Sequence, residues 1–175
     1  YAQATGGISF ALGHYAQALS PSAMALGTAT KASGFNSLAM MRQSAAEGEF
    51  SAALGTASWA KGNGSFAMGY SATAKADQSI AIGAAETIKL PGQQHGTPSA
   101  QYNANGNTVT EGVRSLAFGT KARTSTAAAD SMAFGSSSST GGANAVAMGY
   151  SAKASAENAF AIGNTEKSSA QNAVA

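Results

Sequence analysis

A five-residue motif recurs along the whole sequence, and each complete copy ends in glycine. Its clearest copy is Ser65-Phe66-Ala67-Met68-Gly69, which reads small, large apolar, alanine, large apolar, glycine. Successive copies are mostly 14 residues apart, and such a short fixed period is typical of a solenoid with one coil per repeat. The motif glycines, which we expect to begin turns, are Gly13, Gly27, Gly55, Gly69, Gly83, Gly119, Gly135, Gly149 and Gly163.

Each motif predicts a short β-strand with two different faces, because side chains alternate between the faces of a strand. One face receives Ser or Ala, Ala and Gly, and the other receives the two large apolar residues. A second, weaker strand follows, as in Ala72-Thr73-Ala74. Opposite sheets packed through ordinary side chains lie about 10 Å apart, and a 14-residue coil has little chain to span that gap. We therefore expect the small residues inside the coil and the large apolar residues outside.

This orientation predicts a continuous apolar stripe on the outside of the solenoid. Monomers rarely expose contiguous apolar patches above a few hundred Å², so we expect other copies of the chain to cover the stripe. The opposite orientation, with the large residues inside, would permit a monomer and stays open at this stage. The interface candidates are Phe10, Leu12, Met24, Leu26, Leu38, Met40, Leu54, Phe66, Met68, Ile80, Ile82, Leu116, Phe118, Met132, Phe134, Val146, Met148, Phe160 and Ile162.

One long interruption divides the series of repeats. Gly83 and Gly119 are 36 residues apart, which is one 14-residue step plus 22 inserted residues. Within residues 84–114, Asn105-Gly106 between polar and β-branched residues is a hairpin signal. The sequence thus predicts a single β-roll unit over residues 1–175, with about 11 coils and a protruding loop or hairpin. Because both ends cut through a repeat, we expect this chain to be a piece of a longer protein.

The composition argues against several classes of function. Charged residues make up 10% of the chain, compared with about 25% in ordinary soluble domains, and the net charge is +2. The ten basic residues form no cluster in the sequence, so we expect no nucleic-acid partner. We also expect no membrane contact, because no apolar run approaches the roughly 18 residues of a membrane helix. Cysteine is absent, and neither His14 nor His95 has a nearby acid or nucleophile. We therefore expect no catalytic residues, no metal site and no cofactor.

The repeats resemble the head repeats of trimeric autotransporter adhesins, the YadA-like heads. Asn158-Ala159-Phe160-Ala161-Ile162-Gly163 and Asp130-Ser131-Met132-Ala133-Phe134-Gly135 are similar to the N-S-V-A-I-G form of that family. The resemblance implies an all-β, left-handed parallel β-roll in a side-by-side homotrimer. It also implies display on a bacterial cell surface, anchored to the Gram-negative outer membrane through regions outside this chain. Its implied partners are host extracellular matrix proteins, such as collagen, fibronectin or laminin, or the host cell surface.

Three functions remain to be weighed. The first is an adhesin head that contributes to virulence, with Trp59, His95, Tyr102 and Asn105 as candidate ligand contacts. The second is a passive spacer in a surface fibre, without a ligand of its own. A remote third is an enzyme similar to the left-handed β-helix acyltransferases, which would need a period near 18 residues and histidines between coils. Neither feature is present, so we expect no enzyme.

Overall fold

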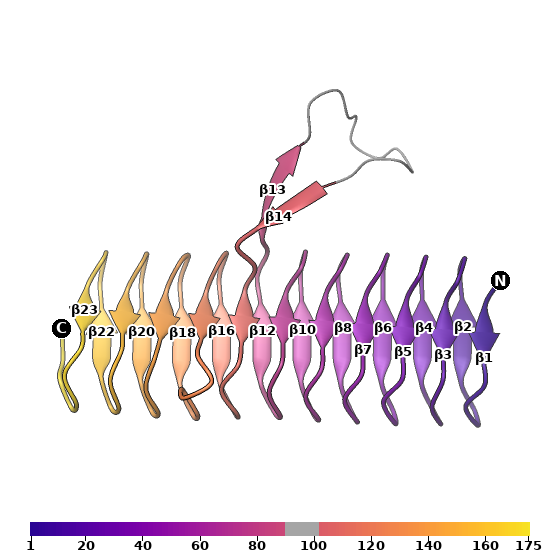
Figure 1. Ribbon diagram of the computed structural model, residues 1–175, viewed down its shortest axis with the longest axis horizontal. Coiled ribbons are helices and arrows are strands. Elements are labelled where there is room, and N and C mark those ends of the chain that lie inside the picture. The colour runs from indigo at the N-terminus through magenta and orange to yellow at the C-terminus, as the bar shows by residue number, and fades with distance from the viewer. Residues whose placement is uncertain (90–101) are drawn as a thin grey trace.

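The structure is a computed structural model that describes residues 1–89 and 102–175. The chain winds into a straight solenoid, and its two ends lie at opposite ends of the long axis (Figure 1). Two parallel sheets run along the solenoid, because the chain adds one strand to each sheet in every coil. The predicted parallel solenoid with 14-residue steps is therefore confirmed.

Sheet A contains eleven strands of two residues each, in the order of the chain. They are β1 (Gln3–Ala4), β3 (Gln17–Ala18), β5 (Lys31–Ala32), β7 (Ala45–Ala46), β9 (Trp59–Ala60), β11 (Thr73–Ala74), β15 (Val109–Thr110), β17 (Arg123–Thr124), β19 (Ser139–Thr140), β21 (Lys153–Ala154) and β23 (Lys167–Ser168).

Sheet B contains ten strands of three residues each, and every one lies in a motif copy. They are β2 (Phe10–Leu12), β4 (Met24–Leu26), β6 (Leu38–Met40), β8 (Ala52–Leu54), β10 (Phe66–Met68), β12 (Ile80–Ile82), β16 (Leu116–Phe118), β18 (Met132–Phe134), β20 (Val146–Met148) and β22 (Phe160–Ile162).

The register of both sheets brings equivalent repeat positions into contact. In sheet B, Phe66 lies beside Ile80, and Ala67 lies beside Ala81. A register slip of one residue would turn every large side chain to the other face, so the repeated pattern fixes the pairing. Each column of side chains at one repeat position is therefore either small or mainly large and apolar along the length of sheet B.

The interior between the sheets holds only small side chains. Every motif alanine from Ala25 to Ala161 is completely buried, and the largest fully buried side chains among the described residues are threonines and serines. Inward-facing serines also satisfy the turns, since the hydroxyl of Ser51 donates to the carbonyl oxygen of Gly48 at 2.6 Å. The size of these residues allows the coil to be narrow, so the alternative with large residues inside is wrong.

The turns use left-handed backbone at matching places in successive coils. Asn36, Asn144 and Asn158 precede motif copies and have φ angles of 51°, 54° and 54°. Asparagine and aspartate are several-fold enriched in this region, which explains why these residues recur there. The motif glycine provides a further positive φ, and Met41 takes its place in the degenerate copy with φ 81°.

The inserted segment leaves the solenoid between β12 and β15 and begins and ends in an antiparallel pair, β13 (Glu86–Lys89) and β14 (Tyr102–Asn105) (Figure 1). Asn105-Gly106 does not form the tip of this hairpin, since Asn105 pairs with Glu86 at its base. Thr108 to Thr110 also belong to the solenoid, where β15 pairs with β11 and β17. A hairpin turn at Asn105-Gly106 was therefore a wrong expectation, because the inserted strands lie earlier in the segment.

Candidate binding surfaces

The outward residues of sheet B form an apolar stripe, which consists of the first and third residues of each sheet B strand. All the predicted interface candidates lie in it, and each keeps part of its surface exposed in the single chain. Leu12 is 63% exposed and Met68 is 47% exposed. The rings of Phe118 and Phe134 stack in adjacent strands, with their centroids 4.8 Å apart. The stripe is thus continuous along the solenoid, as the sequence predicts.

A shallow hollow lies within the stripe, beside the base of the inserted hairpin. Met68, Ile82 and Phe118 line it together with Gly83, and its volume is about 400 Å³. Its lining is almost wholly apolar, and Thr120 is the one residue with a polar side chain among the described residues that line it. The hollow is therefore continuous with the stripe and is not a separate site.

Sheet A presents a different surface, the outer face, which consists of the first residue of each strand and the residue after the strand. Alternation turns the residue between them into the coil, where Ala60 and Ala154 are fully buried. Ion pairs cross this face from Lys31 to Glu47 at 3.4 Å and from Lys75 to Glu111. The outer face is consequently polar and lies opposite the apolar stripe.

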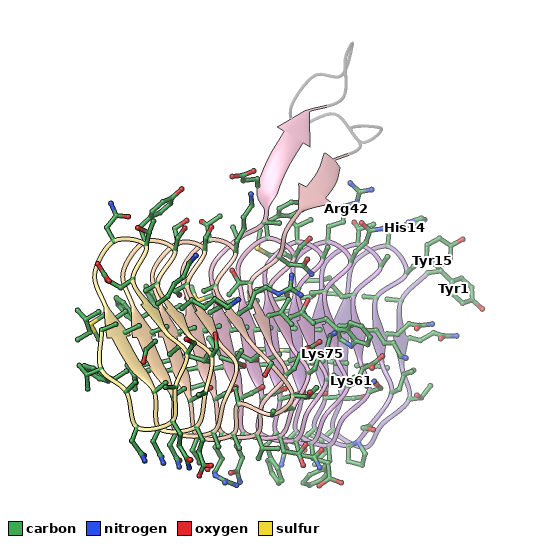
Figure 2. All side chains as sticks on the ribbon, turned by 60° about the vertical axis from the view of Figure 1, so that its left-hand side comes forward. Tyr1, His14, Tyr15, Arg42, Lys61 and Lys75 are labelled. Atoms are coloured by element: carbon green, nitrogen blue, oxygen red, sulfur yellow. The ribbon has the colours of Figure 1, made fainter. Side chains whose placement is uncertain are left out.

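Trp59, a candidate contact residue, lies on the outer face in β9. Its indole N–H donates to Oε2 of Glu47 at 3.0 Å. The ammonium group of Lys61 lies over the ring, 5.5 Å from its centroid, within the range of a cation–π interaction. Figure 2 shows Lys61 and Lys75 on the face between the turns, whereas His14 and Arg42 lie at a turn edge. Trp59 is therefore held in place and is 36% exposed.

The other three candidate contacts belong to the inserted segment. Tyr102 and Asn105 are the first and last residues of β14, and Tyr102 pairs with Lys89. His95 lies outside the described residues. Tyr102 and Asn105 therefore belong to the inserted hairpin, whereas Trp59 lies in the solenoid. A role of the four residues in ligand contact remains a proposal.

The turn edge that precedes sheet B carries polar ladders. Asn144 donates to Asn158, and Asn158 donates to Asn172, both at 3.1 Å. One coil earlier, Nε and Nη2 of Arg114 donate to the two carboxylate oxygens of Asp130, at 2.6 and 2.7 Å. These hydrogen bonds and the positive charge lower the pKa of Asp130, and the same contact raises the pKa of Arg114. The polar residues at this edge therefore have a structural role, because they bond to the equivalent residues of the next coil.

No group of three or more His, Asp or Glu residues that could hold a metal ion occurs within residues 1–89 and 102–175. His14 is exposed at a turn, where its ring contacts the edge of Tyr15 at 4.3 Å between centroids. A helix long and apolar enough to cross a membrane is likewise not found in those same residues.

The sequence profile of the YadA head domain repeat (2 copies) matches residues 18–40, 46–72, 60–85, 111–138, 127–150 and 141–165. These segments cover well over half of the chain, on both sides of the inserted hairpin. The chain belongs to the YadA head family. YadA heads are parts of trimeric autotransporter adhesins, which are surface-exposed, non-enzymatic proteins of the outer membrane. No curated protein sequence matches the chain.

One feature of this YadA head was not predicted from the sequence. Six of its ten basic residues lie on the outer face, although they are far apart in the chain. They are Lys31, Lys61, Lys75, Arg123, Lys153 and Lys167. Their position in the repeat was the available signal. Each comes four or six residues after the fifth position of the motif, which is Gly in all but one copy.

Proposed function

We propose that the chain is part of the head of a trimeric surface adhesin, in which three copies pack side by side with their apolar stripes toward a common axis. The observation that carries this proposal is the exposed apolar stripe of sheet B. Burying a fully exposed large apolar side chain contributes about 1.5–3 kcal/mol. The stripe residues are already partly buried in the single chain, so each gains only part of that amount on assembly, but the gain is repeated along the whole stripe.

A lateral arrangement fits the shape of the stripe. The stripe runs parallel to the solenoid axis over the ten strands of sheet B, so only copies aligned along that axis cover its whole length. Three copies agree with the trimeric nature of the family to which the chain belongs. The outer faces of sheet A then point away from the axis, where ligands reach them.

The proposed role of this head is adhesion to host extracellular matrix proteins, such as collagen, fibronectin or laminin, or to host cells, and thereby virulence. The chain would be held on the outer membrane through regions outside it. Threefold symmetry supports such a role, because three weak sites on one rigid body gain avidity, up to about 10²–10⁴-fold where geometry allows. Contacts by Trp59 and by the inserted hairpin belong to this proposal.

A spacer is the second candidate, and a specific observation favours it. The sheets are unbroken from β1 to β23, so the head is a rigid rod that would hold another domain away from the cell. Immobilised collagen, fibronectin, laminin and host cells separate the two functions. An adhesin binds at least one of them, whereas a spacer binds none.

The trimer is tested by light scattering on the purified chain at pH 7. We expect about three times the chain mass of 17.2 kDa. Met68→Glu places a carboxylate in the stripe. In the single chain this position is exposed to water, whereas in a dry interface between chains the charge would be buried without a partner, so we expect the trimer to be lost. Gln17→Glu makes a matched change on the outer face and should leave the mass unchanged. A folded, soluble wild-type monomer would contradict the proposal.

A further inference from the structure

The basic residues of the outer face are not evenly paired along the solenoid. In the N-terminal half, Lys31 and Lys75 form ion pairs with Glu47 and Glu111. In the C-terminal half, Arg123, Lys153 and Lys167 are all exposed, and none of the three forms an ion pair within the described part of the chain. We call these three residues the basic row.

The register of sheet A aligns the basic row along the solenoid axis. Arg123 pairs with Ser139, Ser139 pairs with Lys153, and Lys153 pairs with Lys167. Neighbouring strands are about 4.8 Å apart, so Lys153 and Lys167 lie side by side, and Arg123 lies about 10 Å from Lys153. Like charges directly opposite each other in a sheet are destabilising, and here no carboxylate offsets them.

The acids near the basic row have other partners or point elsewhere. Glu111 lies on the outer face, one strand from Arg123, and forms its ion pair with Lys75. The side chain of Glu166 is turned toward Gly163, at the turn edge that follows sheet B. Glu157 lies at the other turn edge, where its carboxylate accepts a hydrogen bond from Gln171 at 3.3 Å. Between and beside the cations, the outer face carries the half-buried hydroxyl residues Ser139 and Ser155. The row is thus a straight line of cations flanked by small hydroxyl groups.

We propose that the basic row binds a linear sulfated polysaccharide that lies along the solenoid axis. Sulfate groups repeated along a chain match cations repeated along a straight line, and serine hydroxyls donate hydrogen bonds to sulfate oxygens. This inference rests on the adhesive role proposed above and names the chemistry of one partner. It uses the surface opposite the apolar stripe, so assembly through the stripe leaves the basic row open.

Other polyanions fit this surface less well. Proteins that bind single-stranded nucleic acids combine cations with aromatic side chains on which bases stack. The outer strand positions of β17 to β23 contain no aromatic residue, and Trp59 lies several strands away with Lys61 over its ring. An anionic membrane surface is bound by clusters of four to eight basic residues or by apolar insertion, and the basic row offers neither.

The test measures binding of the intact chain to heparin, used as a soluble sulfated polysaccharide, over a range of NaCl concentrations. We expect the logarithm of the binding constant to fall linearly with the logarithm of salt concentration, because the basic side chains release counterions from the polysaccharide when they bind it. Lys153→Gln/Lys167→Gln should weaken binding at least about tenfold at physiological salt. Lys153→Arg/Lys167→Arg keeps the charges and should stay within about threefold of wild type.

Two sets of controls complete the experiment. Arg42→Gln/Arg114→Gln removes the same charge from the turn edges and should change heparin binding by less than about twofold. Desulfated heparin, a thymidine oligonucleotide and phosphatidylserine vesicles should bind at least about tenfold more weakly than heparin. Thermal unfolding of each variant, followed by circular dichroism, establishes that it is folded.

Several results would overturn the inference. These are no heparin binding at low salt, equal binding by Lys153→Gln/Lys167→Gln and wild type, or equal binding of the oligonucleotide or the vesicles. Failure of the trimer proposal is a separate result, because light scattering detects it. A trimer that does not bind heparin contradicts only the proposed role of the basic row. A monomer that binds heparin contradicts only the proposed assembly.

Discussion

Gly55 lies directly against Gly69 of the next coil. A β-carbon on Gly55 would be 2.5 Å from the carbonyl oxygen of Gly69, closer than real β-carbons approach backbone atoms. The φ angle of Gly55 is 141°, which L side chains rarely adopt. Glycine is therefore required at position 55 both by the turn and by the tight stacking of coils.

Gly55→Ala should lower the free energy of unfolding by at least about 2 kcal/mol, because it combines backbone strain with a clash against the next coil. Gly64→Ala is the matched control, since its β-carbon would meet only Cγ of Gln78 at 3.6 Å. Its φ of 63° is close to the 55° of Phe50, which occupies the same repeat position. Chemical denaturation followed by circular dichroism measures both. Equal losses would show that the coil contact is unimportant.

The two faces of β8 should respond oppositely to the same substitution. Ala53→Leu inserts a large side chain at a fully buried position and should destabilise the fold by about 1–3 kcal/mol or more. Ala52→Leu points outward between Leu38 and Phe66, so it should be neutral or stabilising. Thermal unfolding of the two variants makes the comparison. An Ala53→Leu variant that unfolds at the same temperature as wild type would contradict the narrow interior.

The pair of Arg114 and Asp130 should affect stability at acid pH. The Asp130 pKa is lower when folded than its ordinary 3.8, chiefly because of the hydrogen bonds from Arg114. A depressed folded pKa contributes stability above the unfolded pKa, and that contribution is lost as pH falls through the folded value. NMR titration should show the Asp130 pKa rise toward its ordinary value in Arg114→Gln. An unchanged pKa would show that the pair does not form in solution.

The inserted hairpin should be removable without loss of the solenoid. Strands β11 and β15 pair across it, as do β12 and β16. Deleting residues 86–107 removes the 22 inserted residues and restores the 14-residue step from Gly83. The deletion removes the 2.8 Å ion pair of Glu86 with Lys121 and the 3.4 Å hydrogen bond that Asn107 donates to Thr73.

We therefore expect the deletion variant to have a circular dichroism spectrum of the same type and an unfolding midpoint within a few degrees of wild type. Its binding to matrix proteins and cells then measures the contribution of the hairpin to adhesion. An unfolded product would show that the segment supports the coils.

The repeat pattern was enough to predict most of this fold. The alternation in Ser65 to Gly69 predicts a strand with one small and one large face, and the 14-residue step stacks like on like. Because the small face is the only one that fits inside so short a coil, the outward direction of Phe66 and Met68 also follows from the sequence. Local details of the insertion did not follow, since several pairings of residues 84–114 satisfy the same turn signals.

The tertiary structure alone decided which charges meet. Lys75 and Glu111 are separated by the insertion, yet they pair on the outer face because β11 and β15 are neighbours. Lys153 and Lys167 are one repeat apart, so their contact follows from the period, but only the structure shows that Glu157 and Glu166 point away from them. The sequence by itself determined the period, the two faces and the apolar stripe, because these depend on residue size and spacing. The polar surface depends on which coils are adjacent and on where each side chain finds a partner, and that is decided only when the chain is wound.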